Sequence, residues 1–418
     1  MITKPRGTND IIPGEMALWH FIEKEFRQVC SEYGYAEIRT PLFEHTELFQ
    51  RGVGDTTDIV DKEMYTFRDR GDRSLTLRPE GTAPTVRAFL ENKLHTGPQP
   101  VKLFYWGPMF RYDRPQAGRY RQFHQCGVEV FGAADPAIDA EVIKMSMEYY
   151  RRLGLQNLEL HLNSVGCPRC RPQLHQKLRE YFAPVLDQLC HNCQTRYAKN
   201  PLRLLDCKIC EDKHAAAAPT TLSCLCDDCR ENFAAVKRHL DLLGLPYQVD
   251  NRLVRGLDYY TNTAFEIIAS HIGAQSSIGG GGRYDGLVEV CGGPATPGIG
   301  YALGLERIIL TLREQGCAAP APARPDVYVL NAGPEAAEAA FKLLFRLRQA
   351  GLAADKDYLG RSLKAGMKHA GRLNPRFVLI LGADELAEGV VQVRDMDAQS
   401  QTKVATAQIV DYLQTSLQ

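Results

Sequence analysis

The first 316 residues alternate between helical and strand-like spacing of their apolar side chains. Helical spacing over 14–34, ended by a Tyr-Gly pair, predicts an N-terminal helix, and similar patterns predict helices at 81–94 and 135–153. The remaining pattern predicts a strand–turn–strand unit at 64–82, strands over 249–268, a glycine-rich turn at 276–288, and a strand running into an amphipathic helix at 298–312.

Two stretches place polar and charged residues where strands usually carry apolar ones. Residues 101–132 form two aromatic-rich runs joined by a polar turn, which predicts a long β-hairpin. Because strand side chains alternate faces, Gln125 and Glu129 project together, with a side-chain-free gap at Gly127 between them. The other stretch is LVRGLDYY at 253–260. Polar groups on a sheet are costly unless something pairs with them, so a pocket for a partly anionic ligand is expected.

The chain divides by composition into several regions. An Ala/Pro-rich stretch at 317–325 is typical of an inter-domain linker. After it, strand and helix patterns alternate, which predicts a small α/β domain with a mostly parallel sheet at 326–418. Before it, a cysteine-rich stretch at 166–235 interrupts the strand-rich pattern and is expected to be an insertion into a core formed by 1–165 and 236–316.

Composition limits the classes of partner. A formal net charge of zero gives no global field that would attract nucleic acid, so an RNA contact needs a local basic patch and DNA is not expected. No run approaches the roughly 20 apolar residues of a membrane span, and the N-terminus lacks the apolar core of a signal peptide. A cytoplasmic protein without a membrane partner is therefore expected.

Three arginines are the candidate ligands for an anion, because neither GxxxxGK[ST] nor a GxGxxG between strand and helix occurs. They are Arg111 after the first hairpin arm, Arg255 in RGLDYY and Arg307 in GLER. A guanidinium offers a planar fork of donors that matches phosphate oxygens. Pairing with a nearby carboxylate is the simpler explanation for any one of them, but three in aromatic or glycine-rich contexts favour a ligand.

Several blocks in the right order resemble the histidyl-tRNA synthetases, a family of class II aminoacyl-tRNA synthetases. AEIRTPLFEHTELF (36–49), FRYDRPQAGRYRQFHQ (110–125) and GIGYALGLERI (298–308) resemble the three class II motifs. RGLDYY (255–260) and GGRYDGL (281–287) resemble two blocks peculiar to the histidine enzymes, and LTLRPEGT (75–82) agrees with them. The resemblance implies an α+β fold: an antiparallel-sheet catalytic domain with a helical insertion, followed by a small α/β anticodon-binding domain.

The resemblance also implies an activity and its substrates. The enzyme would activate L-histidine with ATP and Mg²⁺ to histidyl-adenylate, transfer the histidyl group to tRNA(His), and work as a homodimer whose interface includes Pro41. Arg111 and Arg255 would act at the α-phosphate, as the catalytic residues, and Arg307 at the γ-phosphate. The histidine site would comprise Glu80, Gly81, Thr82, Gln125, Glu129, Tyr259, Tyr260 and Tyr284. For Tyr259 and Tyr284, core packing is an equally good explanation.

Two alternatives share the fold without the reaction. One is a non-catalytic paralogue, the regulatory subunit of ATP phosphoribosyltransferase, which normally lacks the C-terminal domain and the intact RGLDYY block. The other is an RNA- or amino-acid-sensing module. The C-terminal domain and the intact RGLDYY block are both present here, which argues against the paralogue. The intact Arg111, Arg255, Arg307 and Glu129 argue against the sensing module.

Nine of the thirteen cysteines fall between Cys167 and Cys229. The four CxxC pairs fit tetrahedral thiolate sites for structural zinc, which the resemblance does not imply. Free thiols or redox pairs are the alternative, and the pairing of the CxxC units stays open. The eight expected ligands are Cys167, Cys170, Cys190, Cys193, Cys207, Cys210, Cys226 and Cys229.

The C-terminal region carries one basic stripe. Arg361, Lys364, Lys368 and Arg372 recur at three- and four-residue spacing, which predicts one helical face. Such a stripe is often only a solvated face. The resemblance of YLGRSLKAGMKHA to an anticodon-binding domain favours contact with tRNA phosphates.

Overall fold

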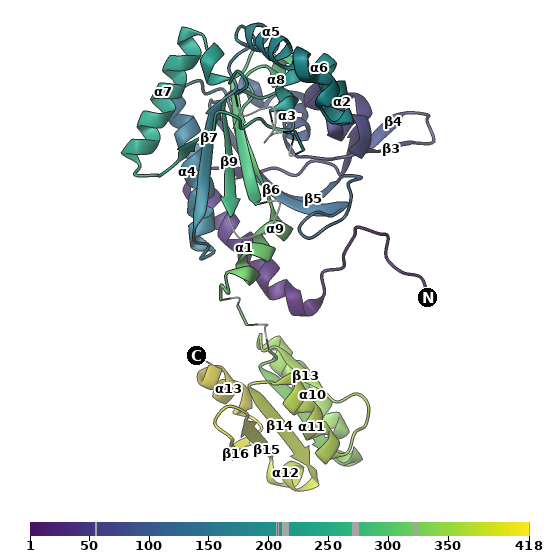
Figure 1. Cartoon of the computed structure of the whole chain (residues 1–418). Coiled ribbons are helices and arrows are strands. Elements are labelled where there is room, and N and C mark those ends of the chain that lie inside the picture. The colour runs from purple at the N-terminus through teal and green to yellow at the C-terminus, as the bar shows by residue number, and fades with distance from the viewer. Residues whose placement is uncertain are drawn as a thin grey trace. The chain divides into compact units, whose positions relative to one another are not determined.

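The structure, a computed structural model, describes residues 1–54, 57–205, 207, 209–210, 217–269, 276–318, 320–321 and 324–417. Contacts divide the chain into two units, Met1–Pro320 and Ala321–Gln418, and the division falls inside the predicted linker (Figure 1). No helix in the described ranges is long and apolar enough to cross a membrane.

An eight-stranded sheet forms the first unit. Its six central strands are antiparallel, and each edge carries one short parallel strand. In spatial order the strands are β1 (Ala36–Glu37), β5 (Val101–Phe110), β6 (Gln122–Phe131), β11 (Gly298–Gly304), β10 (Ser277–Arg283), β9 (Thr261–Ala269), β7 (Leu158–Ser164) and β8 (Gln248–Val249).

The two faces of this sheet differ because side chains alternate along each strand. Val128, Phe265 and Leu303 point to one face and join the main core. Four helices supply the other half of that core: α1 (Pro13–Glu32), α4 (Pro136–Arg152), α7 (Asp227–Leu242) and α9 (Leu305–Glu314). The opposite face keeps the polar and small residues, and so it is available for a site.

The predicted hairpin is confirmed: β5 and β6 pair from Val101–Phe131 to Phe110–Gln122 without a register shift. The strand–turn–strand unit is also confirmed, as β3 (Tyr65–Arg68) and β4 (Ser74–Leu77), and β2 (Phe43–His45) completes a small sheet with them. The helix predicted at 81–94 is α3 (Thr82–Glu91) with a 3-10 turn at Leu94–Thr96. Helices α2 (Thr46–Val53) and α8 (Leu287–Val290) lie close to α3.

Two sequence predictions for this sheet are wrong. LVRGLDYY at 253–260 is not a strand: β8 ends at Val249, β9 starts at Thr261, and the residues between form turns and irregular backbone. The glycine run expected as a turn is the central strand β10. A Cβ on Gly281 would lie 2.0 Å from the carbonyl oxygen of Gly300, so these glycines permit close strand approach rather than a change of direction.

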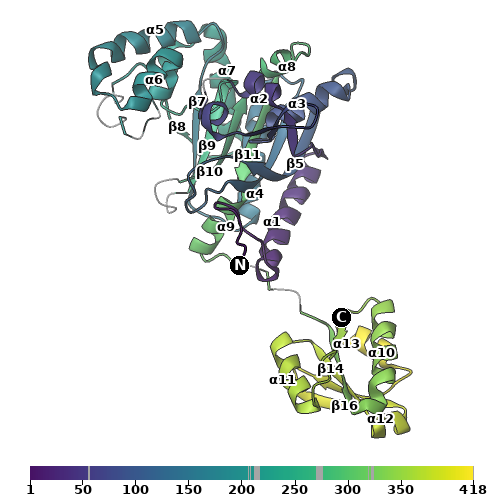
Figure 2. The same ribbon diagram turned by 90° about the vertical axis from the view of Figure 1, so that its right-hand side faces the viewer.

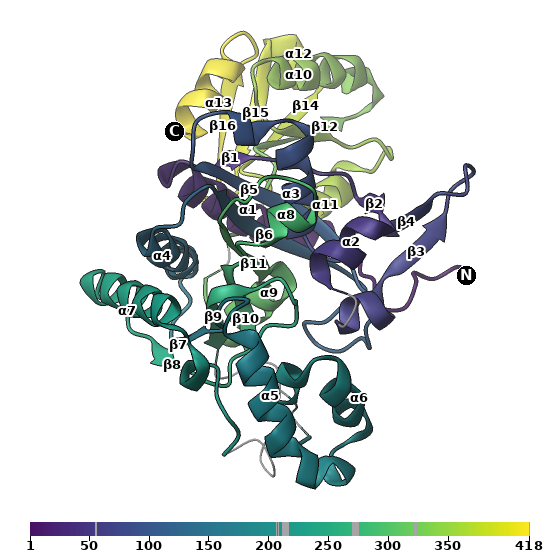
Figure 3. The ribbon, with the colours of Figure 1, turned by 90° about the horizontal axis from the view of Figure 1, so that it is seen from above.

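The insertion has its own small core. Helices α5 (Arg171–Phe182) and α6 (His191–Lys199) lie side by side (Figures 2 and 3), and 3-10 turns at Ala183–Gln188, Pro201–Leu204 and Leu222–Cys224 connect them to α7. Leu178, Phe182 and Cys193 are buried together with the cysteines of the region. The predicted end at residue 235 falls inside α7, whose Val236 and Leu240 pack in the main core beside α4.

The second unit is a five-stranded sheet in the order β13 (Ala354–Lys356), β12 (Val327–Ala332), β14 (Phe377–Gly382), β15 (Val390–Asp395) and β16 (Ser400–Ala405). Two pairings are parallel and two antiparallel, so the sheet is mixed rather than mostly parallel. Helices α10 (Ala337–Gln349) and α13 (Ile409–Leu417) pack on one face, α11 (Leu363–Leu373) packs on the other, and α12 (Ala383–Glu388) precedes β15.

Candidate active site and cysteine clusters

A cavity of about 730 Å³ opens on the polar face of the large sheet. Strands β6, β10 and β11 form its floor, and segments 58–63, 111–120 and 250–260 line its walls. Nine of the predicted site residues line it: Glu80, Thr82, Arg111, Gln125, Arg255, Tyr259, Tyr260, Tyr284 and Arg307. Gly81 and Glu129 do not line it. Glu129 is hydrogen-bonded to two residues that do, Thr82 and Tyr284.

The three arginines reach the cavity from three different elements. Arg111 follows β5, its Nε donates to Pro79 O at 2.8 Å, and its guanidinium lies 5.4 Å from the Phe123 ring centroid. Arg307 is on the first turn of α9, where Nη1 donates to Ser277 O at 2.6 Å and Nε to Gly118 O at 3.2 Å. Burial lowers the pKa of both side chains. A bound anion would lower the cost of keeping these charges buried.

The Arg255 side chain packs against the glycine-rich strand β10. Its Nη1 donates to Glu266 on β9 at 3.1 Å, and a Cβ on Gly280 would lie only 2.9 Å from that same nitrogen. The missing side chain at Gly280 therefore makes room for the guanidinium. Nε of Arg255 is buried and has no hydrogen-bond partner among the described residues, so it is a donor left for a ligand.

Glu129 is buried at 1 % exposure near the C-terminal end of β6. Thr82 Oγ1 donates to its Oε1 at 2.7 Å, and the Tyr284 hydroxyl donates to its Oε2. Burial raises the pKa of Glu129 to about 8, although both hydrogen bonds oppose the rise. A donor bound beside this carboxyl would favour its ionised form.

The predicted gap between Gln125 and Glu129 is filled by a residue that the sequence analysis missed. Tyr105 pairs with Gly127 across the hairpin, and a Cβ on Gly127 would lie 2.4 Å from its ring. The same ring lies 2.3 Å from a Cβ built on Gly81. Counting alternate positions on the first arm would have placed Tyr105 on this face. Gln125 Oε1 remains buried without a hydrogen-bond partner among the described residues.

Glu80 has a structural task as well as a place in the cavity wall. Its carboxylate accepts the backbone N–H groups of Thr82 at 2.7 Å and Ala83 at 2.8 Å, so it caps the start of α3. Burial raises its pKa. The side chain therefore orders the Gly81–Thr82 corner that holds Glu129.

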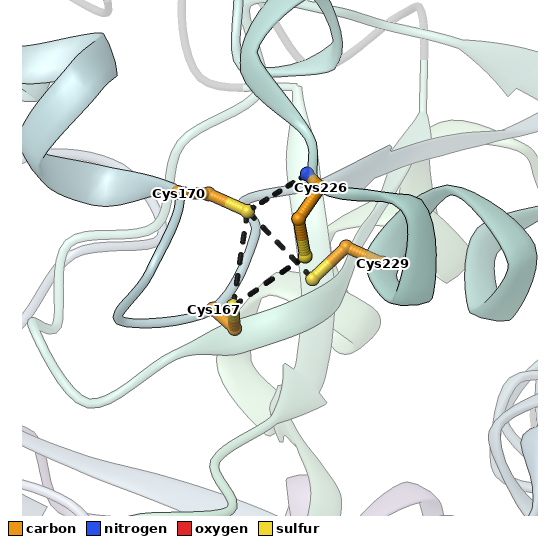
Figure 4. A group of neighbouring side chains, drawn as sticks. All are labelled: Cys167, Cys170, Cys226 and Cys229. Carbon is orange, nitrogen blue, oxygen red and sulfur yellow. Dashed lines mark hydrogen bonds between the residues drawn. The ribbon is translucent and has the colours of Figure 1, made fainter.

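The cysteines form two tetrads, which answers the open question of pairing. Cys167 and Cys170 lie before α5 and meet Cys226 and Cys229 at the start of α7; we call these four the outer tetrad (Figure 4). Cys190, Cys193, Cys207 and Cys210 form the inner tetrad. Within each tetrad all sulfurs lie within 4.8 Å of one another, and Cys224 belongs to neither.

The sulfur spacing suits a tetrahedral metal ion. Measured sulfur–sulfur distances are 3.7, 3.9 and 3.8 Å in the outer tetrad and 3.7 Å between Cys190 and Cys207. Four sulfurs at the usual Zn–S distance of about 2.3 Å stand about 3.8 Å apart. Backbone N–H groups of Cys226 and Cys190 also point at Cys170 and Cys210, at 3.2 and 3.3 Å. Both tetrads could therefore hold a metal.

The basic stripe of the second unit is shorter than predicted. Arg361 precedes α11 and is bound to Asp357 by its backbone N–H and its guanidinium. Lys364, Lys368 and Arg372 are exposed on α11. Their side chains have no ion pair or hydrogen bond within the described residues.

An antiparallel sheet with helices on one face and three arginines around a cavity on the other is the arrangement expected of a class II aminoacyl-tRNA synthetase. Residues 7–308 match the family described as histidyl-tRNA synthetase, and 326–416 match the anticodon binding domain. The chain belongs to the histidyl-tRNA synthetase family.

Relatives resemble the chain over its whole length. The histidine–tRNA ligase of Pelotomaculum thermopropionicum is 64% identical over 100% of this chain and 98% of its own, and that of Desulforamulus reducens is 66% identical over 99% of each. The crystal structure of apo S. aureus histidyl-tRNA synthetase superposes with a TM-score of 0.84 at 42% identity, covering 99% of this chain and 100% of that one.

More distant structures share the fold. A Bacillus halodurans structure titled ATP phosphoribosyltransferase regulatory subunit/histidyl-tRNA synthetase has a TM-score of 0.62 at 20% identity, over 92% of this chain and 99% of that chain. Such a likeness shows the fold alone. The full-length relatives named as ligases favour the enzyme over the paralogue.

Proposed function

We propose that this chain is a histidine–tRNA ligase, which activates L-histidine with ATP and Mg²⁺ to histidyl-adenylate and transfers the histidyl group to tRNA(His). The observation that carries the proposal is one cavity that brings Arg111, Arg255 and Arg307 together with the unpartnered acceptor of Gln125. Three cations suit a triphosphate, and a buried free acceptor suits an ammonium group.

ATP binding is assigned to the three arginines. Arg111 would bind the α-phosphate and the histidine carboxylate, Arg255 would approach the α-phosphate from the opposite side, and Arg307 would bind the γ-phosphate. Within the described residues, Nε makes the only protein hydrogen bond of the Arg111 guanidinium, so its terminal nitrogens are available. Mg²⁺ bound to the phosphates belongs to the substrate.

Histidine binding is assigned to the polar floor. Gln125, with Glu80 and Thr82, would bind the α-amino group, and Glu129 and Tyr260 would bracket the imidazole. Tyr284 and Thr82 hold the Glu129 carboxyl from two sides, which fixes its orientation. Tyr259 lies 4.8 Å from Tyr260 and 5.6 Å from Tyr284 between ring centroids, so it closes the aromatic wall. A substrate without imidazole nitrogens would forgo the hydrogen bond to Glu129 and would be bound less tightly.

Little covalent chemistry is required of the protein. The histidine carboxylate attacks the α-phosphorus in line and pyrophosphate leaves. The terminal ribose hydroxyl of tRNA then attacks the histidyl carbonyl, loses its proton, and AMP leaves. Arg111 and Arg255 would hold the carboxylate and the phosphate in place and offset the charge that develops on the phosphate oxygens. Because the donors are already fixed in a buried site, they need no reorganisation in the transition state.

Histidine-dependent ATP–pyrophosphate exchange tests the reaction. Removing one such donor lowers kcat by about 10²–10³, so Arg255→Ala is expected to lose exchange by that factor. Arg151→Ala is a suitable control, because Arg151 is exposed on α4 and pairs with Glu148 outside the cavity. An unaltered chain without exchange would refute the ligase and favour the sensor or regulatory alternatives.

Binding of tRNA is assigned in part to α11. Lys364, Lys368 and Arg372 recur at four-residue spacing and are exposed, so they can contact successive phosphates. The paired Arg361 contributes less directly, by fixing the turn before the helix. A homodimer is expected through the segment around Pro41, where Leu42 and Phe43 are exposed at 44% and 51%.

The two tetrads are assigned to two structural zinc ions. Each offers four cysteine sulfurs and no open position, which is the character of a structural rather than a catalytic site. Protein purified without added zinc is expected to carry two ions per chain, and Cys193→Ser to carry one. Cys224→Ala is the control and should keep both. A metal-free chain with nine reactive thiols in the insertion would refute the assignment.

A further inference from the structure

Segment 250–260, which carries Arg255, Tyr259 and Tyr260, lacks a helix or strand, so its conformation depends on neighbouring residues. Three of its backbone carbonyls are bound by arginines of the insertion. Arg203 Nη1 donates to Arg255 O at 3.2 Å, Arg171 Nη1 donates to Asp258 O at 3.2 Å, and Arg171 Nη2 donates to Tyr260 O.

Of these two arginines, Arg171 restrains the segment more, because it binds two of its carbonyls. It binds two carbonyls on either side of Tyr259 with one planar guanidinium, which restricts the direction of the segment more than a single bond does. Arg171 is partly buried, and it lines a second cavity, of about 250 Å³, between the insertion and the segment. Tyr260 lines both cavities, whereas Arg171 lines only this second one and does not line the active-site cavity.

The outer tetrad determines where Arg171 stands. Arg171 is the first residue of α5 and follows Cys170 directly, and its N–H donates to Cys167 O at 3.3 Å. On the other side of Tyr260, Cys229 Sγ contacts Asn262 Oδ1 at 3.0 Å, and Asn262 N donates to Gly166 O at 2.9 Å. The tetrad thus contacts the chain just after Tyr260 through Cys229, and it fixes the start of the helix that carries Arg171.

We propose that Arg171 is a positioning residue for histidine activation: by binding the carbonyls of Asp258 and Tyr260, it directs the Tyr260 side chain into the cavity. This inference rests on the proposed function. Of the three ATP arginines, Arg111 follows β5 and Arg307 is on α9, apart from Arg171. The third, Arg255, has its backbone carbonyl bound by Arg203 and not by Arg171. The effect should therefore fall more on histidine than on ATP.

Steady-state ATP–pyrophosphate exchange tests this role. Small misplacement of a binding group costs up to about 10²-fold, so Arg171→Ala is expected to raise KM for histidine roughly ten- to hundredfold while KM for ATP changes less than about threefold. Arg171→Lys keeps a cation and can bind one carbonyl. Its KM for histidine should therefore lie between that of the unaltered chain and that of Arg171→Ala. If Arg171→Ala does not fold, Arg171→Lys carries the test.

Two further variants separate positioning from general stability. Arg179→Ala is the matched control: Arg179 lies on the same helix and also donates to a carbonyl, Ala198 O at 3.3 Å, but within the insertion. It should leave both KM values unchanged. If Arg171 acts through Tyr260, the effects of Arg171→Ala and Tyr260→Phe on histidine KM should not add.

The outcomes are distinct. An unchanged histidine KM in the Arg171 variants, or an equal rise in both KM values, would overturn the positioning role while leaving the ligase activity in place. An unaltered chain without histidine-dependent exchange would remove the proposed function and this inference together.

Discussion

The Glu129 carboxyl is expected to make both folding stability and histidine binding depend on pH. Its pKa is raised to about 8 by burial, so near neutral pH the folded chain holds a proton that the unfolded chain has lost. The contribution of this group to folding stability therefore falls as pH rises from its ordinary pKa toward 8. Histidine binding follows the opposite trend, because the imidazole N–H requires the ionised carboxylate.

Substrate binding is accordingly expected to strengthen with pH. KM for histidine should fall about five- to tenfold between roughly pH 7 and 8.5, a range in which free imidazole is already neutral. The Glu129→Gln side chain cannot ionise. This variant should bind histidine more weakly, and its KM for histidine should be nearly independent of pH. An equally steep profile in Glu129→Gln would assign the titration to another group.

Gly127 is expected to be intolerant of even one methyl group. Its Cβ would lie 2.4 Å from the Tyr105 ring, which is enclosed by Gly81 on the other side. Overpacking of this kind costs about 1–3 kcal/mol, so Gly127→Ala should lower the free energy of unfolding by that amount and raise KM for histidine. Gly286→Ala is the control, because nothing lies within 4 Å of its Cβ. Equal stabilities, measured by urea unfolding, would contradict the close packing.

The sequence correctly predicted which side chains share a face of a strand, because this depends only on their alternation along the chain. Alternation placed Gln125 and Glu129 on one face, and both project from the polar face of β6. It could not show that Thr82 and Tyr284 hold Glu129, since these contacts join residues 47 and 155 positions apart. Nor could it show that Asp357 binds Arg361, because local spacing alone suggested one helical face.

At the scale of elements, local pattern identified the hairpin and most helices but failed for two segments whose conformation is set by their neighbours. The glycines of β10 lack the side chains that mark a strand, and their strand character comes from pairing with β9 and β11. The 250–260 segment falls within the strands predicted over 249–268, but its apolar residues Leu253, Leu257 and Tyr260 do not follow the alternate spacing of a strand. Its backbone carbonyls are instead bound by insertion arginines and by Asn163.

The tetrads were predictable in number but not in pairing, because the CxxC spacing is the same in every pair. The outer pairs close across α5 to α7, and so the outer tetrad contacts the chain just after Tyr260. Cys226→Ser is therefore expected to raise KM for histidine in the same direction as Arg171→Ala, while Cys224→Ala does not. Exchange kinetics together with zinc analysis of both variants would check this. An outer-tetrad variant that loses zinc but keeps its histidine KM would separate the metal from the site.

At the scale of the whole molecule, each unit has its own hydrophobic core, and the division lies between Pro320 and Ala321. Activation and tRNA recognition are therefore expected to respond to different changes. The triple variant Lys364→Ala, Lys368→Ala, Arg372→Ala should leave ATP–pyrophosphate exchange intact and raise KM for tRNA.

The salt dependence of that variant is the sharper measurement. Each phosphate contact removed should reduce the slope of log affinity against log salt by about one, so loss of three contacts predicts a slope shallower by about three. Lys342→Ala, exposed on α10, is the control. An unchanged slope would mean that α11 is only a solvated face.

The glycine strand β10 also limits how the sequence of this region can change over time. A methyl group at Gly279, Gly280 or Gly281 would come within 2.4, 2.6 and 2.0 Å of neighbouring atoms, and two of those neighbours are backbone carbonyls that cannot rotate away. No single neighbouring substitution can relieve a collision with backbone, so compensating pairs of mutations are closed to Gly280 and Gly281, whereas the neighbour of Gly279 is the Leu303 side chain. In a pool of random variants selected for growth on this gene alone, Gly280 and Gly281 should be the residues that return unaltered.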